Sequence, residues 1–233
     1  MNDVAQIQTL FLDDKSQIRG ALRILAPLGF GTKYIAPIMS DFLKMYPNIN
    51  LELELSDKPN WSDSHRWDMI IYIGELRDSS LKLMKLAANQ RFLCASPEYL
   101  KDHGAPKSPH QLVDHHCIAL RENFEDVTLW RFTDKKSETE ESVRIVPKLA
   151  SNDGSVTKAW ALKGQGIMLR SEWDVQAELN NGALKRVLSN YSLPSADIVA
   201  LLGTDNRSRT AKTKKFLAYL KQRIAQKPWL NNE

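Results

Sequence analysis

The sequence predicts an α/β protein whose single chain folds into two subdomains. The apolar residues of 49–55 alternate with polar ones, the period-two pattern of a half-buried strand. Residues 68–74 form a continuous apolar run, as in parallel strands that are covered on both faces. The pattern changes after Ser96 and returns to a strand near Val199, so we expect a second α/β subdomain inserted between these two points.

The first elements follow from local signals. Residues 4–19 carry apolar side chains at helical spacing, which indicates a short helix leading into the domain or the tail of a longer one. A compact strand at 22–26 and a glycine-bearing turn at 27–31 come next. Together with the strand at 49–55, they predict a βαβ unit.

The helix of this βαβ unit is expected to extend from close to Thr32 to Tyr46. Its start is inferred from Pro37, which a helix tolerates only near its first turn, and Pro47 ends it. This helix has more apolar residues than one buried stripe needs, and the candidates for the excess are Tyr34, Met45 and Tyr46. They either form a contact between two copies of the chain or pack inside the monomer.

The remaining elements are short until the C-terminal helix. We expect helical stretches at 62–66, 98–101, 109–113 and 155–162 and one that ends at 180–182, strands at 81–86, 91–95, 117–120, 129–132, 143–147, 166–169 and 197–203, and a long helix at 209–225. These elements predict one subdomain made of 20–95 with 199–233 and another made of 96–198.

Composition places the chain among ordinary globular proteins. Its 233 residues are 42% hydrophobic and 26% charged, and no apolar run approaches the roughly 20 residues of a membrane helix. The N-terminus has no signal-peptide pattern, so we expect a cytoplasmic protein. Cys94 and Cys117 lie far apart in apolar segments, which predicts buried thiols and neither a redox pair nor a zinc site. The net charge of +4 is low for a domain that holds DNA through many phosphates.

Several segments resemble a known family. The runs 20–24 (Gly-Ala-Leu-Arg-Ile), 27–32 (Pro-Leu-Gly-Phe-Gly-Thr), 94–100 (Cys-Ala-Ser-Pro-Glu-Tyr-Leu) and 164–167 (Gly-Gln-Gly-Ile) are similar to the effector-binding domain of LysR-type transcriptional regulators. The resemblance covers nearly the whole chain from Gly20, in order. Within the family, the stretch from Trp160 to Val175 looks most like the CrgA-like branch and its regulators of malate- or tartrate-like acids.

This resemblance implies a periplasmic-binding-protein type 2 fold, in which two Rossmann-like subdomains are joined by two crossover segments around a ligand cleft. It also implies a homodimer or tetramer, a small organic anion as effector, and no cofactor or metal. Residues 1–19 would be the remnant of a linker helix. DNA would be bound only through an N-terminal winged helix-turn-helix, which we expect to be absent from this chain, so the chain is either an excised domain or a sensor-only protein.

Ligands of open α/β folds bind beyond the carboxyl ends of the strands, and the first such end is the turn at 27–32. Gly29 and Gly31, on either side of Phe30, permit close approach of the backbone, and Thr32 offers a hydroxyl. The following helix presents unpaired N–H groups that suit an anion. The alternative is an ordinary strand-to-helix turn.

A second helix start in the other subdomain contains Ser151 and Asn152, which either face the same anion or cap their own helix. Arg121 and Arg170 follow apolar strands and suit a bidentate carboxylate clamp, the alternative being surface arginines. Ser56 and Glu75 end strands of the first subdomain and are weaker candidates. The predicted effector is a hydroxy-dicarboxylate such as malate or tartrate, bound between Thr32 and the pair Ser151/Asn152 with help from Arg121 or Arg170.

Two rival functions remain. A free-standing solute-binding protein of the same fold is disfavoured by the missing export signal. A small α/β enzyme would depend on Asp114-His115-His116-Cys117, where no carboxylate or second histidine pair completes a metal shell or catalytic set. Gly29 and Gly31 lack the third glycine of a dinucleotide site, and no phosphate-loop motif is present.

Overall fold

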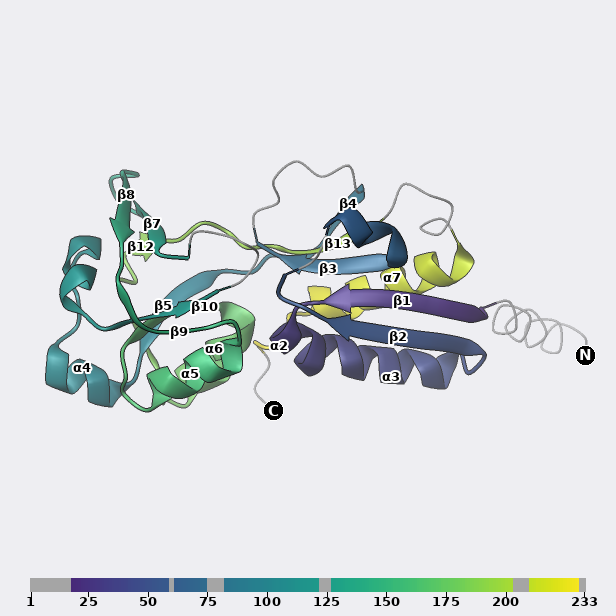
Figure 1. Ribbon diagram of the computed structural model, residues 1–233, viewed down its shortest axis with the longest axis horizontal. Coiled ribbons are helices and arrows are strands. Elements are labelled where there is room, and N and C mark those ends of the chain that lie inside the picture. Colours follow the sequence, from purple (N-terminus) through teal and green to yellow (C-terminus); the bar gives the residue numbers. More distant parts are fainter. Residues whose placement is uncertain (1–17, 59–60, 75–81, 122–126, 203–209, 231–233) are drawn as a thin grey trace, which may run out of the picture. The chain divides into compact units, whose positions relative to one another are not determined.

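The computed structural model describes residues 18–58, 61–74, 82–121, 127–202 and 210–230. It divides into two compact units. The first contains the described residues up to Ala87 together with those of Ile198–Gln226, and the second contains the described residues of Ala88–Asp197 together with Lys227–Leu230 (Figure 1). Except for Ile18 and Arg19, the stretch interpreted as a linker-helix remnant lies outside the described residues.

The sheet of the first unit is mixed, whereas the sequence predicted a parallel one. Its strands lie in the order β2 (Ile49–Leu55), β1 (Gly20–Ala26), β3 (Met69–Ile73), β13 (Ile198–Leu202) and β4 (Lys82–Ala87). β1 is parallel to β2 and β3, but β13 is antiparallel to β3 and β4. Every residue of β3 and β13 is buried, as in strands covered on both faces. The apolar run at 68–74 therefore indicates burial but does not determine whether the neighbouring strands are parallel or antiparallel.

The helix after β1 begins earlier than the sequence predicted. It consists of α2 (Leu28–Phe30), a π-helical turn (Gly31–Ile35) and α3 (Ala36–Met45), so Pro37 is well inside it. A proline has no N–H to donate, and its ring would clash with the carbonyl four residues earlier in a regular α-helix. The wider π turn directly before it removes this conflict, and the helix therefore does not have to begin near Thr32.

Aromatic packing inside the monomer involves two of the three residues that we considered for a contact between copies. The Tyr34 ring centroid lies 5.1 Å from that of Phe30, and the Tyr46 centroid lies 4.7 Å from that of Phe42. Phe42 also meets Phe216 of α7 (Ala211–Ala225) edge-on at 5.1 Å, which joins α3 to α7. Met45, the third candidate, is half-buried.

The second unit contains two sheets (Figure 1). The larger has the order β11 (Lys185–Val187), β5 (Arg91–Ala95), β10 (Ile167–Ser171), β6 (Cys117–Leu120) and β9 (Pro147–Ser151), and the smaller has β12 (Tyr191–Ser192), β7 (Leu129–Asp134) and β8 (Glu140–Arg144). The helices are α4 (Pro97–His103), α5 (Gly154–Leu162) and α6 (Glu172–Asn180), and 3-10 turns occupy Trp61–Arg66 in the first unit and Pro109–Asp114 in the second. β10 and β9 both pair with β6 in parallel.

The two units divide the chain at other residues than the predicted subdomains, most clearly at β5 and at the C-terminal tail. β5 pairs with β10 and β11, so it belongs to the second unit although the sequence assigned 91–95 to the first. The tail after α7, from Lys227, also belongs to the second unit. The chain passes between the units at Ala87/Ala88 and again at Asp197/Ile198.

Both cysteines are buried and free, as predicted. Cys94 of β5 and Cys117 of β6 belong to separate apolar clusters of the second unit and lie in the strands that flank β10. Among the described residues no helix has the length and hydropathy of a membrane span.

Candidate functional site

The predicted site residues gather at the carboxyl ends of parallel strands, at one edge in each unit. In the first unit, Gly29, Phe30, Gly31 and Thr32 follow β1 and Ser56 follows β2, whereas Glu75 lies outside the described residues. In the second unit, Arg121 follows β6. Ser151 is the last residue of β9 and Asn152 follows it, and Arg170 is the penultimate residue of β10. The sequence could predict which residues lie at these two edges, because each candidate comes at or directly after the end of an apolar strand.

At the first edge, most of the predicted groups are occupied by the fold itself. The N–H of Leu28, which opens α2, donates to Oδ1 of Asp57 at 2.9 Å, and the Thr32 hydroxyl donates to the carbonyl of Leu28 at 2.9 Å. Phe30 is fully buried. A Cβ on Gly31 would lie 2.3 Å from Cδ2 of Leu55, so this glycine makes room for apolar packing. Thr32 and Gly29 are exposed.

At the second edge, the helix α5 begins one residue later than its predicted caps. Asp153 is the N-cap, and its Oδ1 accepts from the N–H and the hydroxyl of Ser155, both at 2.7 Å. These hydrogen bonds lower the pKa of Asp153. Neither Ser151 nor Asn152 caps the helix: the Ser151 hydroxyl accepts from the Asp153 N–H at 3.0 Å, and Asn152 is exposed.

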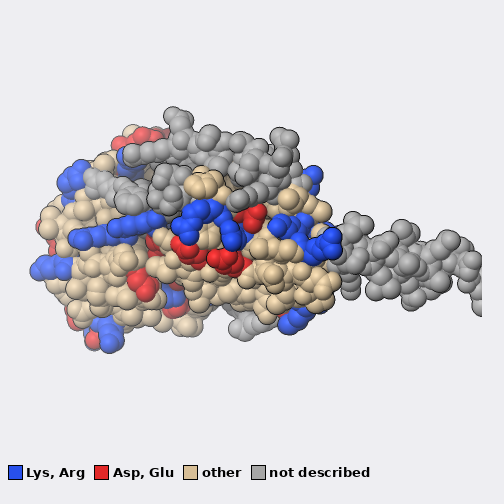
Figure 2. Space-filling view, turned by 45° about the vertical axis from the view of Figure 1, so that its right-hand side comes forward, with Lys and Arg blue, Asp and Glu red and all other residues tan. Residues whose placement is uncertain are grey.

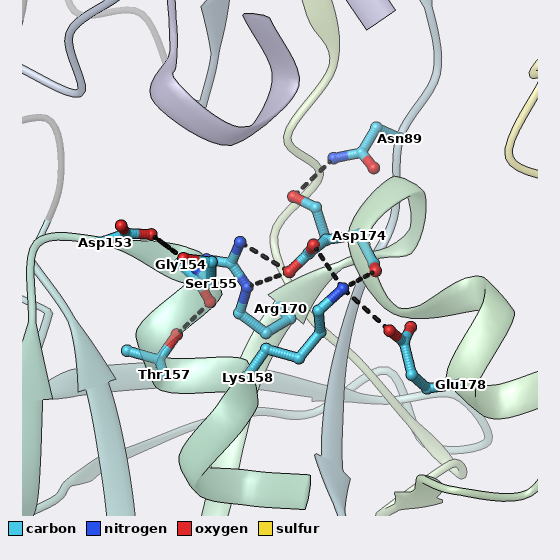
Figure 3. Close-up of polar contacts among 10 residues, drawn as sticks. Asn89, Asp153, Gly154, Ser155, Thr157, Lys158, Arg170, Asp174 and Glu178 are labelled. Carbon is cyan, nitrogen blue, oxygen red and sulfur yellow. Dashed lines mark hydrogen bonds and ion pairs between the residues drawn. The ribbon is translucent and has the colours of Figure 1, made fainter. Parts of the chain in front are cut away.

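Arg170 belongs to a network of alternating charges in which Arg170 and Asp174 are buried and Lys158 and Glu178 are half-buried (Figure 3). Its Nε and Nη2 both lie 2.8 Å from Oδ2 of Asp174. Nζ of Lys158 lies 3.1 Å from Oδ1 of the same carboxylate and 3.0 Å from Oε1 of Glu178. Burial would raise the pKa of Asp174, but the positive charges of Arg170 and Lys158 outweigh it and hold this pKa below its usual value. The carboxylates likewise raise the pKa of Lys158 against the effect of burial.

The guanidinium of Arg170 also lies directly against the start of α5 (Figure 3). A Cβ on Gly154 would be 2.2 Å from Nη2 and 2.6 Å from Cζ of Arg170, so only glycine leaves room for this arrangement. The ion pair with Asp174 fixes the guanidinium beside the helix N-terminus, where backbone N–H groups carry partial positive charge. Sequence reasoning named Arg170 but missed Gly154 and Asp174. The Gly154 contact depends on how α5 packs on β10, whereas Asp174 lies only four residues after Arg170, and this short spacing of opposite charges could have indicated the pair.

Arg121 differs from Arg170 in its exposure. Its side chain is exposed, and its backbone N–H donates to the carbonyl of Ser151 at 2.8 Å. That bond places the first residue after β6 beside the last residue of β9. The second edge therefore combines one exposed cation, one buried and ion-paired cation, and the N-terminus of α5.

The segment 114–117, which carried the enzyme alternative, packs around Tyr99. The Tyr99 hydroxyl lies 3.1 Å from Nδ1 of His115 and accepts from the N–H of His116 at 2.9 Å. Burial raises the pKa of Cys117 to about 12, and its thiol donates to the carbonyl of Leu112 at 3.6 Å. Such a thiol is not the thiolate that nucleophilic chemistry requires. Within the described parts of the chain, no group of three or more His, Cys, Asp or Glu side chains is arranged to hold a metal ion.

Basic and acidic side chains are interspersed on the face shown in Figure 2, which accords with a net charge of only +4. An extended surface of one sign, as in domains that bind the DNA backbone, does not cover this face.

Residues 15–225 match the family described as LysR substrate binding domain. The chain belongs to this family. The fold is that of a mixed α/β effector-binding domain of the periplasmic-binding-protein type, as the sequence predicted.

Two bacterial regulators illustrate the relationship. The HTH-type transcriptional regulator DmlR of Escherichia coli (strain K12) is 33% identical over 229 residues, which are 97% of the chain and 72% of DmlR. The HTH-type transcriptional activator TtdR of the same strain is 35% identical over 202 residues, which are 85% of the chain and 64% of TtdR. The regulatory domain of CrgA, a LysR-type regulator from Neisseria meningitidis, has a TM-score of 0.73 at 25% identity and covers 88% of the chain and 98% of that domain.

These relatives confirm the predicted class: the chain is a ligand-sensing regulatory domain of the LysR type. They are named as transcriptional regulators, which favours this interpretation over a free-standing binding protein or an enzyme.

Proposed function

We propose that this domain senses a small hydroxy-dicarboxylate, such as malate or tartrate, and that the second edge supplies its main anion contacts. The observation that carries the proposal is the guanidinium of Arg170, which Asp174 holds against Gly154 at the start of α5. A guanidinium and a helix N-terminus that lie side by side both attract negative charge, so together they favour binding of a carboxylate. The buried partners of Arg170 keep it in one geometry, so little order has to be created when the anion binds.

The exposed groups of the same edge would complete recognition. Arg121 is an exposed cation whose guanidinium suits a second carboxylate, and Asn152 offers an amide that both donates and accepts. A hydroxy-dicarboxylate carries matching groups, namely two carboxylates and at least one hydroxyl. Thr32 and Ser56 of the first edge remain predicted contributors of hydroxyl contacts.

Regulation would follow from unequal affinity. A ligand that binds two arrangements of the domain equally shifts neither, so the effector has to favour one of them. We propose that this preference is passed to a DNA-binding region of the complete regulator, which acts in the cytoplasm as a homodimer or tetramer. No catalytic step is needed for this role.

Thermal unfolding with a stereochemically complete panel of malates and tartrates tests the proposal at constant ionic strength. A ligand at a hundredfold excess over its Kd stabilises the folded state by about 2.7 kcal/mol, which visibly raises Tm. We expect Arg121→Gln to weaken binding by about tenfold or more, because a charge-assisted hydrogen bond is lost. Asn152→Asp should weaken it through charge repulsion.

Arg131 of β7 provides the matched control, because it is an exposed arginine of the same unit in the other sheet. Arg131→Gln should leave the Tm shift unchanged. If no member of the panel raises Tm at millimolar concentration, the dicarboxylate assignment is wrong. Undiminished binding in both Arg121→Gln and Asn152→Asp would place the effector away from the second edge.

A further inference from the structure

The C-terminal tail after α7 belongs to a different unit from the helix that precedes it. α7 is part of the first unit, and Lys227–Leu230 are part of the second. The backbone of Lys227 has φ of +46°, in the left-handed region, and the N–H of Leu230 donates to its carbonyl at 2.9 Å. The left-handed residue ends α7 and turns the chain, a position at which glycine is usual.

One buried carboxylate receives the tail. Oε2 of Glu172 accepts from the indole Nε1 of Trp229 at 3.1 Å and from Nζ of Lys227 at 3.1 Å. Glu172 is 7% exposed and Trp229 is 6% exposed. Burying a carboxylate without such partners costs free energy, so the contacts stabilise both the buried charge of Glu172 and the docked position of the tail.

The same short junction, Ser171–Glu172 between β10 and α6, also holds the first segment by which the chain passes between the units. The N–H of Glu172 donates to the carbonyl of Gln90 at 2.8 Å, and the Ser171 hydroxyl accepts from Nδ2 of Asn89 at 3.1 Å. Nδ2 of Asn89 in turn donates to the carbonyl of Ala196 in the second passing segment at 2.9 Å. All three segments that lead into the second unit are therefore fastened at or next to this junction (Figure 3 shows Asn89 beside the charge network).

We propose that the tail is a latch. Glu172 fastens Lys227 and Trp229, and the chain then has a third tether between the units beside the two at Ala87/Ala88 and Asp197/Ile198. Two tethers permit hinge motion, and a third one that can be fastened or released limits its range. Release of the tail would free the end of α7 and widen the range of arrangements.

The latch lies next to the proposed effector contacts along the chain. Arg170 comes two residues before Glu172, and Asp174 comes two residues after it. An effector bound by Arg170 would therefore act within two residues of Glu172, at the end of the same strand. This last step, unlike the latch itself, rests on the proposed function.

Hydrogen exchange and small-angle scattering on the full chain, without effector, test the latch. We compare Glu172→Gln, Trp229→Phe and Lys227→Gly, the last of which removes the amine while relieving the left-handed backbone. Each should speed amide exchange at 226–230 and in the passing segments 88–90 and 196–198 by about tenfold. Each should also change the radius of gyration. Lys221→Met, an exposed lysine of α7, is the control and should change neither.

Two results would overturn the latch. If amides of 226–230 exchange at the unstructured rate in the unmodified chain, the tail is not docked. If the variants release the tail while the passing segments and the scattering stay unchanged, Glu172 is only a local anchor. Because these measurements need no effector, a latch that passes them while no dicarboxylate binds would refute the proposed function alone.

Discussion

The helix after β1 and the helix after β9 both carry a glycine near their start, but different groups lie against the two glycines. Gly31 faces the apolar side chain of Leu55, whereas Gly154 faces the guanidinium of Arg170. The first turn is held by packing and by the carboxylate of Asp57, and the second by a network of four charged side chains. A glycine at a strand-to-helix turn therefore does not by itself indicate a ligand site: the group that occupies the freed space decides.

The largest effect is expected where the second turn loses its cation. Arg170→Met keeps an unbranched side chain but leaves the buried Asp174 with only Lys158 as its cation, which should lower the free energy of unfolding by about 3 kcal/mol. Urea unfolding measures it. Arg170→Ala should carry the same penalty, so it is not a clean probe of ligand binding. A loss below about 1 kcal/mol would mean that the network contributes little to stability.

The two glycines can be compared directly by replacing each with alanine. Gly154→Ala should destabilise by about 1–3 kcal/mol, because its Cβ displaces the guanidinium from Asp174. Gly31→Ala should cost less, since its Cβ meets the end of a leucine side chain that can change rotamer, and alanine favours the helix. Adding Leu55→Ala should recover stability in Gly31→Ala. Shortening an apolar side chain should recover none in Gly154→Ala, whose Cβ meets the guanidinium of Arg170. Equal losses, or rescue of both by apolar changes, would remove the distinction.

Periodicity predicted most of the strands, but it failed where the signal is not local. The strand at 143–147 is instead two strands, β8 (Glu140–Arg144) and β9 (Pro147–Ser151), because β9 begins at a proline and contains few apolar residues. The antiparallel direction of β13 also has no local signature. Strand direction is set by where the chain returns, and the returning segment comes more than 100 residues after β3.

The site shows the same limit. Arg121 and Arg170 were proposed because each comes at the end of an apolar strand. Asp57 was missed because it accepts from a helix that begins 29 residues earlier, a contact that depends on packing between elements. Asp174 was missed although it lies only four residues after Arg170, so the spacing of these opposite charges was a local signal.

A smaller effect is expected at the first turn. Asp57→Ala removes the carboxylate that accepts from the Leu28 N–H, and loss of such a helix cap lowers the free energy of unfolding by about 1 kcal/mol. Asp57→Asn should retain most of the stability, since an amide oxygen also accepts. Urea unfolding of both variants checks the prediction. Equal losses would assign the stabilisation to the charge of Asp57 at the helix N-terminus in place of the hydrogen bond.

The smallest effect is expected on mild acidification, and it should arise in the second unit. Burial lowers the pKa of His115, and the nearby His103 and His116 lower it further, against the opposing effect of Asp114. The folded state then favours the neutral imidazole, while the unfolded chain protonates near its ordinary pKa of about 6.5. The free energy of unfolding should therefore fall as the pH drops below about 6.5, and this contribution is lost in full once the pH is below the folded pKa.

Unfolding at about pH 7.5 and about pH 5.5 measures this loss of stability in acid. The loss should be smaller in His115→Gln than in the unmodified chain, and His65→Gln, which changes an exposed histidine of the first unit, is the control. The same acid loss in all three proteins would show that His115 does not couple folding to protonation.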